Sequence, residues 1–144
     1  MDPKRIRETF AWMETVVAIP PASAVEVECE LVRRLYSTHE WEQTRAMLTD
    51  DFALIGPGGT RAGLDELRRT NELMAGAYED LHAEIETIVA DPDQPFVLWV
   101  RDHSRGRAKE TGERLDVRAW SRVVLAPDGA RVRELGPSSV INSA

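Results

Sequence analysis

Cysteine is almost absent from this chain of 144 residues, which contains only Cys29. A single cysteine excludes an internal disulfide and a thiolate metal cluster within one chain, because each requires at least two thiols. The three histidines are far apart and show neither a His-x-x-x-His pair nor an acidic partner at ligand spacing, so we expect no metal site. A reducing cytoplasm is the expected location.

Long apolar runs and an excess of basic residues are also lacking. The apolar stretch at residues 12–19 is short, contains Glu14 and has no small-residue cleavage site, so we expect neither a membrane span nor a signal peptide. The chain has 18 basic and 25 acidic side chains, a net charge of -7. This balance disfavours a nucleic-acid partner, because phosphate binding requires clustered lysines and arginines. No glycine-rich phosphate loop is present, and we expect no cofactor.

Helical patterns fill the first half of the chain. Asp2 and Pro3 favour a helix start, and Pro20 and Pro21 end the pattern. Its apolar side is broad and consists of Ile6, Phe10, Met13 and Val17, widened by Trp12, Val16 and Ile19. A helix lying freely on water does not need so many large apolar side chains. We therefore expect it either to cover a pocket as a lid or to pack on a second subunit, and we favour the second arrangement.

Three further helices are predicted from apolar residues spaced three and four positions apart. The first begins at Ser23, the second spans residues 40–48 and the third spans residues 64–77. The stripe of the first helix consists of Val25, Cys29, Val32 and Tyr36, and that of the third consists of Leu67, Asn71, Met74 and Tyr78.

Strand patterns fill the second half. Strands are predicted at residues 52–55, 81–89, 96–103, 114–125 and 131–135, with turns at residues 56–59, 91–95 and 128–129. Helices followed by an antiparallel meander indicate an α+β domain. We divide the chain into an additional N-terminal helix at residues 1–22, the main domain at residues 23–137 and a tail at residues 138–144.

Four local segments, taken in order, resemble the nuclear transport factor 2-like superfamily and in particular its SnoaL-like polyketide cyclase branch. They are LTDDF at residues 48–52, GPGG at 56–59, YEDLH at 78–82, and TGERLDVR at 111–118 followed by Asp128-Gly129. Together they extend the resemblance over roughly residues 24–136.

The resemblance implies a cone-shaped α+β barrel, in which a strongly curved mixed or antiparallel sheet wraps around the N-terminal helices and leaves a cavity at the wide end. It also implies a homodimer formed through the outer face of the sheet. Enzymes and non-catalytic adaptors share this fold, so the function has to be argued from the site.

The sequence departs from the acids of these relatives. The aspartate base of the ketosteroid isomerases would fall at Gly56, their tyrosine near Val32 and their second acid at Ser121. The aspartate of the SnoaL-like cyclases also falls at Ser121. Because glycine, valine and serine cannot abstract a proton at neutral pH, other residues would have to carry the chemistry.

The predicted strand at residues 96–103 offers the first candidates. Trp99, Arg101 and His103 share one face because side chains alternate along a strand. If that face borders the cavity, His103 could act as an acid and base and Arg101 could stabilise an enolate, with Trp99 as an apolar wall. Alternatively Phe96, Leu98 and Val100 point inward, and Arg101 and His103 lie in solvent.

Glu134 is the third catalytic candidate, because it is two residues after Val132 on the side that we expect to face inward. A desolvated carboxylate there could replace the missing aspartate. Alternatively it pairs with an arginine, namely Arg101, Arg118 or Arg133. His39 and His82 are interpreted as surface residues.

The hypothesis is a small-molecule pocket that assists cyclisation, dehydration or isomerisation of a polyketide-like or polycyclic substrate by acid–base catalysis. His103, Arg101 and Glu134 would act on the substrate. The expected ligand contacts are Trp99, Ser121, Val117, Ala119, Tyr78 and Tyr36. The alternative is a non-catalytic ligand-binding or adaptor module of the same fold.

Overall fold

The structure, a computed structural model, describes residues 22–141. The helix expected at residues 2–19 lies outside this range. The described helices are α2 (Ala22–Ser37), α3 (Trp41–Ala46) and α4 (Leu64–Ala77), with a short 3-10 turn, η1 (Pro57–Gly59). The strands are β1 (Leu48–Ile55), β2 (Arg61–Ala62), β3 (Tyr78–Ala90), β4 (Val97–Ala108), β5 (Arg114–Leu125) and β6 (Val132–Ile141).

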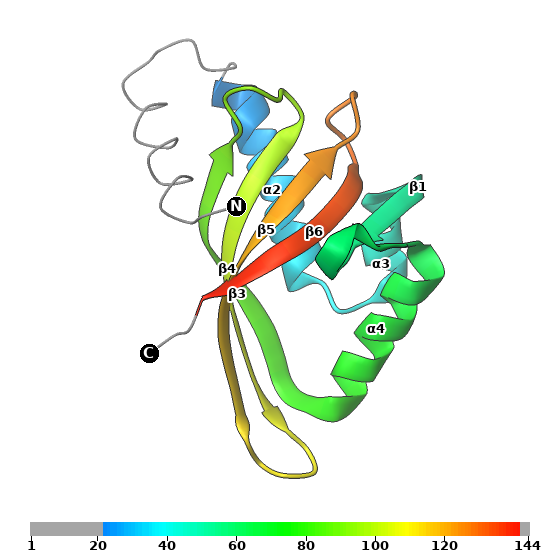
Figure 1. Ribbon diagram of the computed structural model, residues 1–144, viewed down its shortest axis with the longest axis vertical. Coiled ribbons are helices and arrows are strands. Elements are labelled where there is room, and N and C mark those ends of the chain that lie inside the picture. The colour runs from blue at the N-terminus through cyan, green and yellow to red at the C-terminus, as the bar shows by residue number, and fades with distance from the viewer. Residues whose placement is uncertain (1–21, 142–144) are drawn as a thin grey trace.

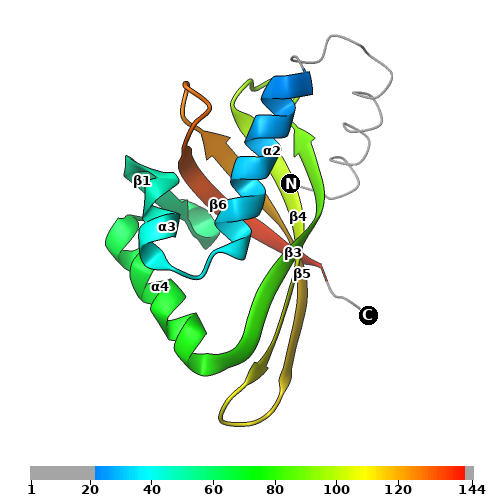
Figure 2. The same ribbon diagram turned by 180° about the vertical axis from the view of Figure 1, so that it is seen from behind.

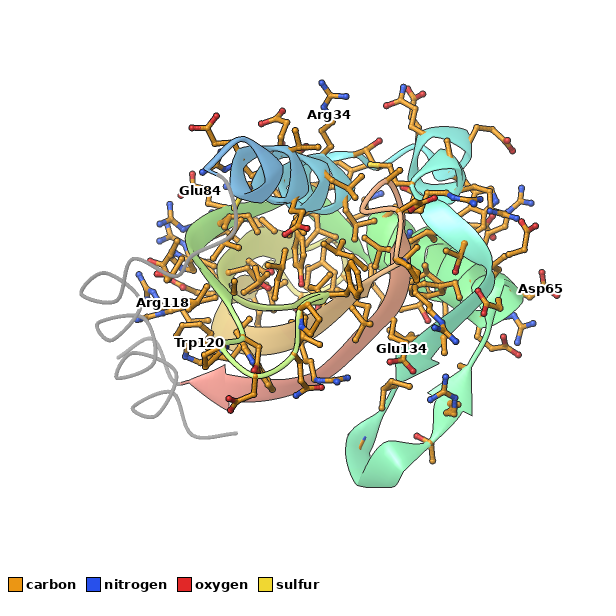
Figure 3. The ribbon with its side chains drawn as sticks, turned by 90° about the horizontal axis from the view of Figure 1, so that it is seen from above. Arg34, Asp65, Glu84, Arg118, Trp120 and Glu134 are labelled. Atoms are coloured by element: carbon orange, nitrogen blue, oxygen red, sulfur yellow. The ribbon has the colours of Figure 1, made fainter. Side chains whose placement is uncertain are left out.

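The six strands form one mixed sheet in the order β2-β1-β6-β5-β4-β3. β1 and β6 are parallel and every other neighbouring pair is antiparallel. α2, α3 and α4 lie on one side of this sheet (Figures 1 and 2), and the view from above shows the strands curving around α2 (Figure 3). The predicted α+β fold with a curved sheet around helices is confirmed.

The two faces of the sheet pack differently. On the side of α2, α3 and α4, here called the inner face, Leu98, Val100 and Val123 form the main core with Val32 and Leu67 of the helices. The outer face carries a second, smaller cluster that is made of strand residues. The inner face is therefore the one that a helix-enclosed cavity can use.

α4 begins and ends as the sequence predicts. The Gly63 backbone N–H donates a 2.9 Å hydrogen bond to Oε2 of Glu66, and Asp65 and Glu66 place negative charge at the helix N-terminus. β5 also matches its predicted range, whereas β4 extends to Ala108 and β6 to Ile141. The predicted turn at residues 56–59 is confirmed, with positive φ at Gly58 and Gly59.

Two irregularities reverse the alternation that the sequence predicts. In β3 the register shifts between Ile85 and Thr87, so Ile85 packs in the main core while Val89 joins the outer cluster. β6 contains a similar shift, because Leu125 faces Val132 and Val124 faces Glu134. Two residues that are two positions apart across a shift, such as Ile85 and Thr87 or Val132 and Glu134, therefore lie on opposite faces of the sheet instead of the same face.

β6 passes very close to β1 at Gly136. Its φ is 101°, and a Cβ at this position would lie 2.3 Å from the Ile55 carbonyl oxygen. Such a distance is far below van der Waals contact, and the positive φ is strained for any other residue type. Glycine is what allows the parallel pair to form here.

Candidate functional site

A cavity of about 470 Å³ opens between the C-terminal part of α2, α4 and the start of β3. Its apolar walls include Leu35, Leu48, Leu67, Met74, Leu81 and Leu135. Its polar walls include Tyr36, Thr38, His39, Thr44, Asn71 and Asp80. A mostly apolar hollow of this size with a few polar groups is typical of a small-molecule site.

One wall of this cavity is the stripe of α4 that the sequence predicts to face inward. Leu67, Asn71 and Met74 follow the helical spacing, and Tyr78 follows at the start of β3. The inward orientation of this stripe is confirmed. His39, interpreted as a surface residue, is exposed and also borders the cavity.

Asp102 lies on the inner face of β4 and is only 6% exposed. Burial raises the pKa of its carboxyl group from 3.8 to about 6, against a smaller lowering by a hydrogen bond from Ser104. The Ser104 hydroxyl donates that bond over 3.3 Å to Oδ1 of Asp102. A carboxyl group with such a pKa can gain or lose a proton near neutral pH.

Tyr36 and Ser121 meet beside this acid. Val100 faces Ser121 and Asp102 faces Ala119 in the β4–β5 pair, so Asp102 and Ser121 are diagonal neighbours on the inner face. The hydroxyl groups of Tyr36 and Ser121 share a hydrogen bond, while burial and the charge of Asp102 raise the pKa of the Tyr36 phenol. The phenol therefore stays neutral near pH 7.

Tyr36 joins this polar group to the cavity. The Tyr36 side chain lines the cavity, whereas Asp102 and Ser121 are not among the described residues that border it. The arrangement places the Tyr36 side chain at the cavity wall and a titratable carboxyl group close to its neutral hydroxyl group. It can polarise a carbonyl oxygen and move a proton.

The predicted group of Trp99, Arg101 and His103 shares one face of β4, but that face is the outer one. Leu98 and Val100 point to the helices instead, as the alternative interpretation of this strand had it. That alternative also placed His103 in solvent, which is wrong, because His103 is only 4% exposed. The sequence left the choice open because both faces of the strand are apolar around residues 96–100. The expected orientation toward the cavity is thus corrected.

The polar members of that group have partners on the outer face. Arg101 pairs with Glu86 at 3.3 Å, and His103 contacts Asp116 and Arg105. None of these three residue pairs borders the cavity among residues 22–141.

Glu134 also lies on the outer face, contrary to the expectation, because of the register shift in β6. It forms ion pairs with Arg61 at 2.8 Å and Arg122 at 3.7 Å. The alternative of an arginine partner therefore holds, although the arginines differ from those that the sequence suggested.

The expected ligand contacts divide into three groups. Tyr36 and Tyr78 line the cavity. Val117, Ala119 and Ser121 are on the inner face of β5, opposite Ser104, Asp102 and Val100, respectively. Trp99 is on the outer face.

Asp102 is the functional candidate that the sequence interpretation missed. In the sequence it alternates with Leu98 and Val100, which is the one available signal: an acidic residue in step with the most apolar positions of a strand. Assigning that face to the core would have identified it.

A larger and shallower groove of about 1610 Å³ runs along α2 toward α3 and the β5–β6 turn. Exposed charged residues such as Glu30 and Arg34 line it and pair with each other at 3.4 Å. A ligand there would stay in contact with water, so the enclosed cavity is the stronger candidate.

Within residues 22–141, no three His, Cys, Asp or Glu side chains gather as a metal site would require. No helix in the same range is long and apolar enough to cross a membrane.

Comparisons with known proteins agree with this architecture. Residues 30–134 match the family of SnoaL-like domains. No match was found among curated proteins. The fold is similar to IdmH from Streptomyces antibioticus, a protein assigned as a polyketide cyclase, at 15% identity over 78% of this chain and 91% of that one, with a TM-score of 0.67.

Two other solved structures are similar to the same degree. PrhC from Penicillium brasilianum NBRC 6234 has 15% identity over 78% of this chain and 79% of its own, with a TM-score of 0.68. A protein from Jannaschia sp. CCS1, classed as a SnoaL-like polyketide cyclase, has 16% identity over 80% and 85%, with a TM-score of 0.66. At such identities the structures support the fold. Since the family match spans most of the chain, the protein belongs to the SnoaL-like domain family and has the nuclear transport factor 2-like fold.

Proposed function

We propose that the protein is an acid–base catalyst that acts on a small hydrophobic ketone of polyketide type, without a cofactor. The observation that carries this proposal is the buried Asp102, whose pKa is raised to about 6 next to the cavity-lining Tyr36. Raised carboxyl pKa values beside an apolar cavity are typical of catalytic acids and bases. The polyketide class is supported by the SnoaL-like family match.

The reaction class that fits these groups is proton abstraction from a carbon next to a carbonyl. Because Asp102 does not border the cavity itself, the substrate would have to extend past Tyr36 to bring its C–H bond to the carboxylate. The C–H bond then breaks, the proton passes to the Asp102 carboxylate, and the electron pair moves to the carbonyl oxygen. The neutral Tyr36 hydroxyl donates a hydrogen bond to that oxygen and stabilises the enolate.

Ring closure then needs no further reagent. The enolate carbon attacks a second carbonyl group of the same molecule, forming a carbon–carbon bond and an alkoxide. The proton on Asp102 returns to the alkoxide, so the catalyst is restored. If the substrate carries a C=C bond conjugated with the enolate, the intermediate is a dienolate, and return of the proton to its γ-carbon gives isomerisation instead.

The test uses α-tetralone, a bicyclic aromatic ketone, in deuterium oxide. NMR measures hydrogen–deuterium exchange at the carbon next to its carbonyl group. The protein should accelerate exchange, and Asp102→Asn should lower the protein-dependent rate by about 100-fold or more. The rate should rise with pH through about 6 and then level off, because the ionised carboxylate is the base.

The matched control is Glu84→Gln, which makes the same carboxylate-to-amide change at an exposed position of β3. It should keep the exchange rate of the unaltered protein. An Asp102→Asn protein that exchanges α-tetralone as fast as this control would remove Asp102 from the mechanism.

The second candidate function is ligand binding without turnover. One observation favours it: Ser121 occupies the position at which the cyclase resemblance places the catalytic aspartate, and Asp102 does not itself border the cavity. Native mass spectrometry of freshly purified protein separates the two. A retained small molecule, together with no acceleration of exchange, would support the binding module.

A further inference from the structure

The cavity has one acidic side chain at its wall that the proposed function does not use. Asp80 is exposed and borders the cavity near the point where α4 passes into β3 (Figure 2). None of the described residues that line the cavity is a lysine or an arginine, and none of the others is an aspartate or a glutamate. Asp80 therefore supplies the only carboxylate of the described wall.

A β-bulge directs Asp80 to the cavity. The register of the β3–β4 pair shifts between Glu79 and His82. Asp80 and Leu81 therefore stand together opposite the single Gly106, which makes the bulge. In a regular strand two successive residues point to opposite faces, whereas Asp80 and Leu81 both border the cavity. Bulges that re-aim a side chain in this way are common next to ligand sites.

The backbone at Asp80 is held in an uncommon conformation. Its φ is 52°, and among residues 22–141 no other residue except glycine has a positive φ. The Nδ1–H of His82 donates a 2.7 Å hydrogen bond to the Asp80 carbonyl oxygen. A left-handed backbone at a residue other than glycine costs stability, and such residues are concentrated at ligand and active sites. The bulge and this hydrogen bond together keep Asp80 at the cavity wall.

No described side chain neutralises Asp80. It forms no ion pair within residues 22–141, in contrast to Glu86 and Glu134 of the outer face. Lys109, which follows β4, donates a 3.5 Å hydrogen bond to the Ala75 carbonyl oxygen instead. A carboxylate without a cation at the wall of a mostly apolar cavity attracts a cationic group of a ligand and repels an anionic one.

We propose that the cavity takes a hydrophobic molecule with a protonated amine group, and that Asp80 binds this amine and determines the specificity. This substrate class rests on the proposed function, because the molecule that bears the amine would be the ketone on which Tyr36 and Asp102 act. The rings of Tyr36 and Tyr78 border the same cavity, and a protonated amine is attracted to the face of such rings. The substrate is thus an amino ketone, with its carbonyl group toward Tyr36 and its amine at Asp80.

The test compares three ligands with one bicyclic skeleton. They are 2-aminotetralin, which is a cation at neutral pH, 2-tetralol, which is neutral, and tetralin-2-carboxylate, which is an anion. NMR titration of the full-length protein measures the dissociation constant of each. The cation should bind about fivefold or more tightly than the alcohol, because the Asp80 carboxylate attracts it. The anion should bind more weakly than the alcohol.

Asp80→Asn removes the charge and keeps the backbone, because asparagine accepts a positive φ as aspartate does. It should weaken the binding of 2-aminotetralin about fivefold or more and leave the binding of 2-tetralol unchanged. If the variant also loses 2-tetralol, Asp80→Gly replaces it, because glycine adopts this φ without strain. The matched control is Glu79→Gln, which removes the same charge from the neighbouring exposed residue that does not border the cavity, and it should keep the preference for the cation.

The outcomes separate this specificity from the catalysis. Equal affinities for the amine and the alcohol, or a preference for the amine that persists in the Asp80 variants, would overturn the role of Asp80 and leave the catalytic role of Asp102 in place. A preference lost equally in Glu79→Gln would show a general effect of surface charge and would also overturn it. Absence of binding by all three ligands would contradict this role and the cavity function together. A preference that depends on Asp80, in a protein that does not exchange α-tetralone, would support the amine site and contradict the catalysis.

Discussion

The acidic residues on the two faces of the sheet differ in whether they pair with cations. On the outer face, Glu86 lies between Arg101 and Arg118, and Glu134 lies between Arg61 and Arg122. On the inner face, Asp102 is more deeply buried than either glutamate, and no lysine or arginine among the described residues forms an ion pair with it.

The difference separates a structural use of charge from a functional one. Paired charges at a partly exposed surface contribute little stability and perturb little chemistry. A buried carboxyl group without a cation costs stability and titrates near neutral pH, and such groups cluster at functional sites. The outer face has more charged residues, which is why the sequence interpretation selected its residues. Among the described residues, the inner face has a single buried acid without a cation, and this is the property expected of a functional site.

The largest expected effect tests whether the inner face holds the main core. Leu98 is 1% exposed within that core, and Leu98→Ala should lower the free energy of unfolding by about 2–5 kcal/mol. Leu73→Ala is the control: Leu73 is 68% exposed, so its loss should change stability by less than about 0.5 kcal/mol. Urea denaturation measures both. Equal losses in the two variants would contradict the assignment of the core.

The next effect tests the cost of the buried acid. Asp102 has a higher pKa in the folded protein than its ordinary value of 3.8, so its contribution to stability is complete below pH 3.8 and is lost as the pH rises through about 6. Asp102→Asn removes this dependence. Relative to the unaltered protein, the variant should gain up to about 3 kcal/mol between about pH 4 and pH 8.

Urea denaturation of both proteins at the two pH values gives this difference directly. The exposed Glu84→Gln variant should show no comparable gain. A stability difference between Asp102→Asn and the unaltered protein that does not change with pH would mean that the carboxyl group is solvated and not buried.

The smallest effect connects the two faces. Glu86→Gln should lower the free energy of unfolding by about 1 kcal/mol or less, because Glu86 and its two arginines are partly exposed. The negative charge of Glu86 also raises the pKa of Asp102, so its removal should move the midpoint of the α-tetralone exchange profile to lower pH. A midpoint that stays in place would show that the two faces are electrostatically independent, and one that moves upward would contradict the expected sign of the effect.

The sequence predicts elements well where one periodicity dominates. The helix at residues 64–77 and the strand at residues 114–125 agree with α4 and β5 because each has one apolar and one polar side. The final strand was predicted too short because Pro137 breaks a strand pattern. In the structure β6 pairs with β1 only as far as Leu135. Pro137 lies beyond that point, so its missing N–H costs no hydrogen bond to β1.

The site was less predictable for reasons that are local. Around residues 96–100 both faces of β4 are apolar, and alternation cannot say which one faces the helices. The shifts at Ile85/Thr87 and Val124/Leu125 each add one residue to a strand, and no pattern in the sequence marks them. Glu134 changed faces for this reason, whereas Asp102 could have been found once Val100 was assigned to the core.

The passage of Gly136 beside Ile55 has a consequence for the size of the chamber. This contact joins the β1–β2 corner, and with it α4, to the rest of the sheet, and α4 supplies Leu67, Asn71 and Met74 to one wall. A methyl group at position 136 would push β1 outward and carry that wall with it. The volume open to a substrate thus depends partly on the absence of a side chain at Gly136.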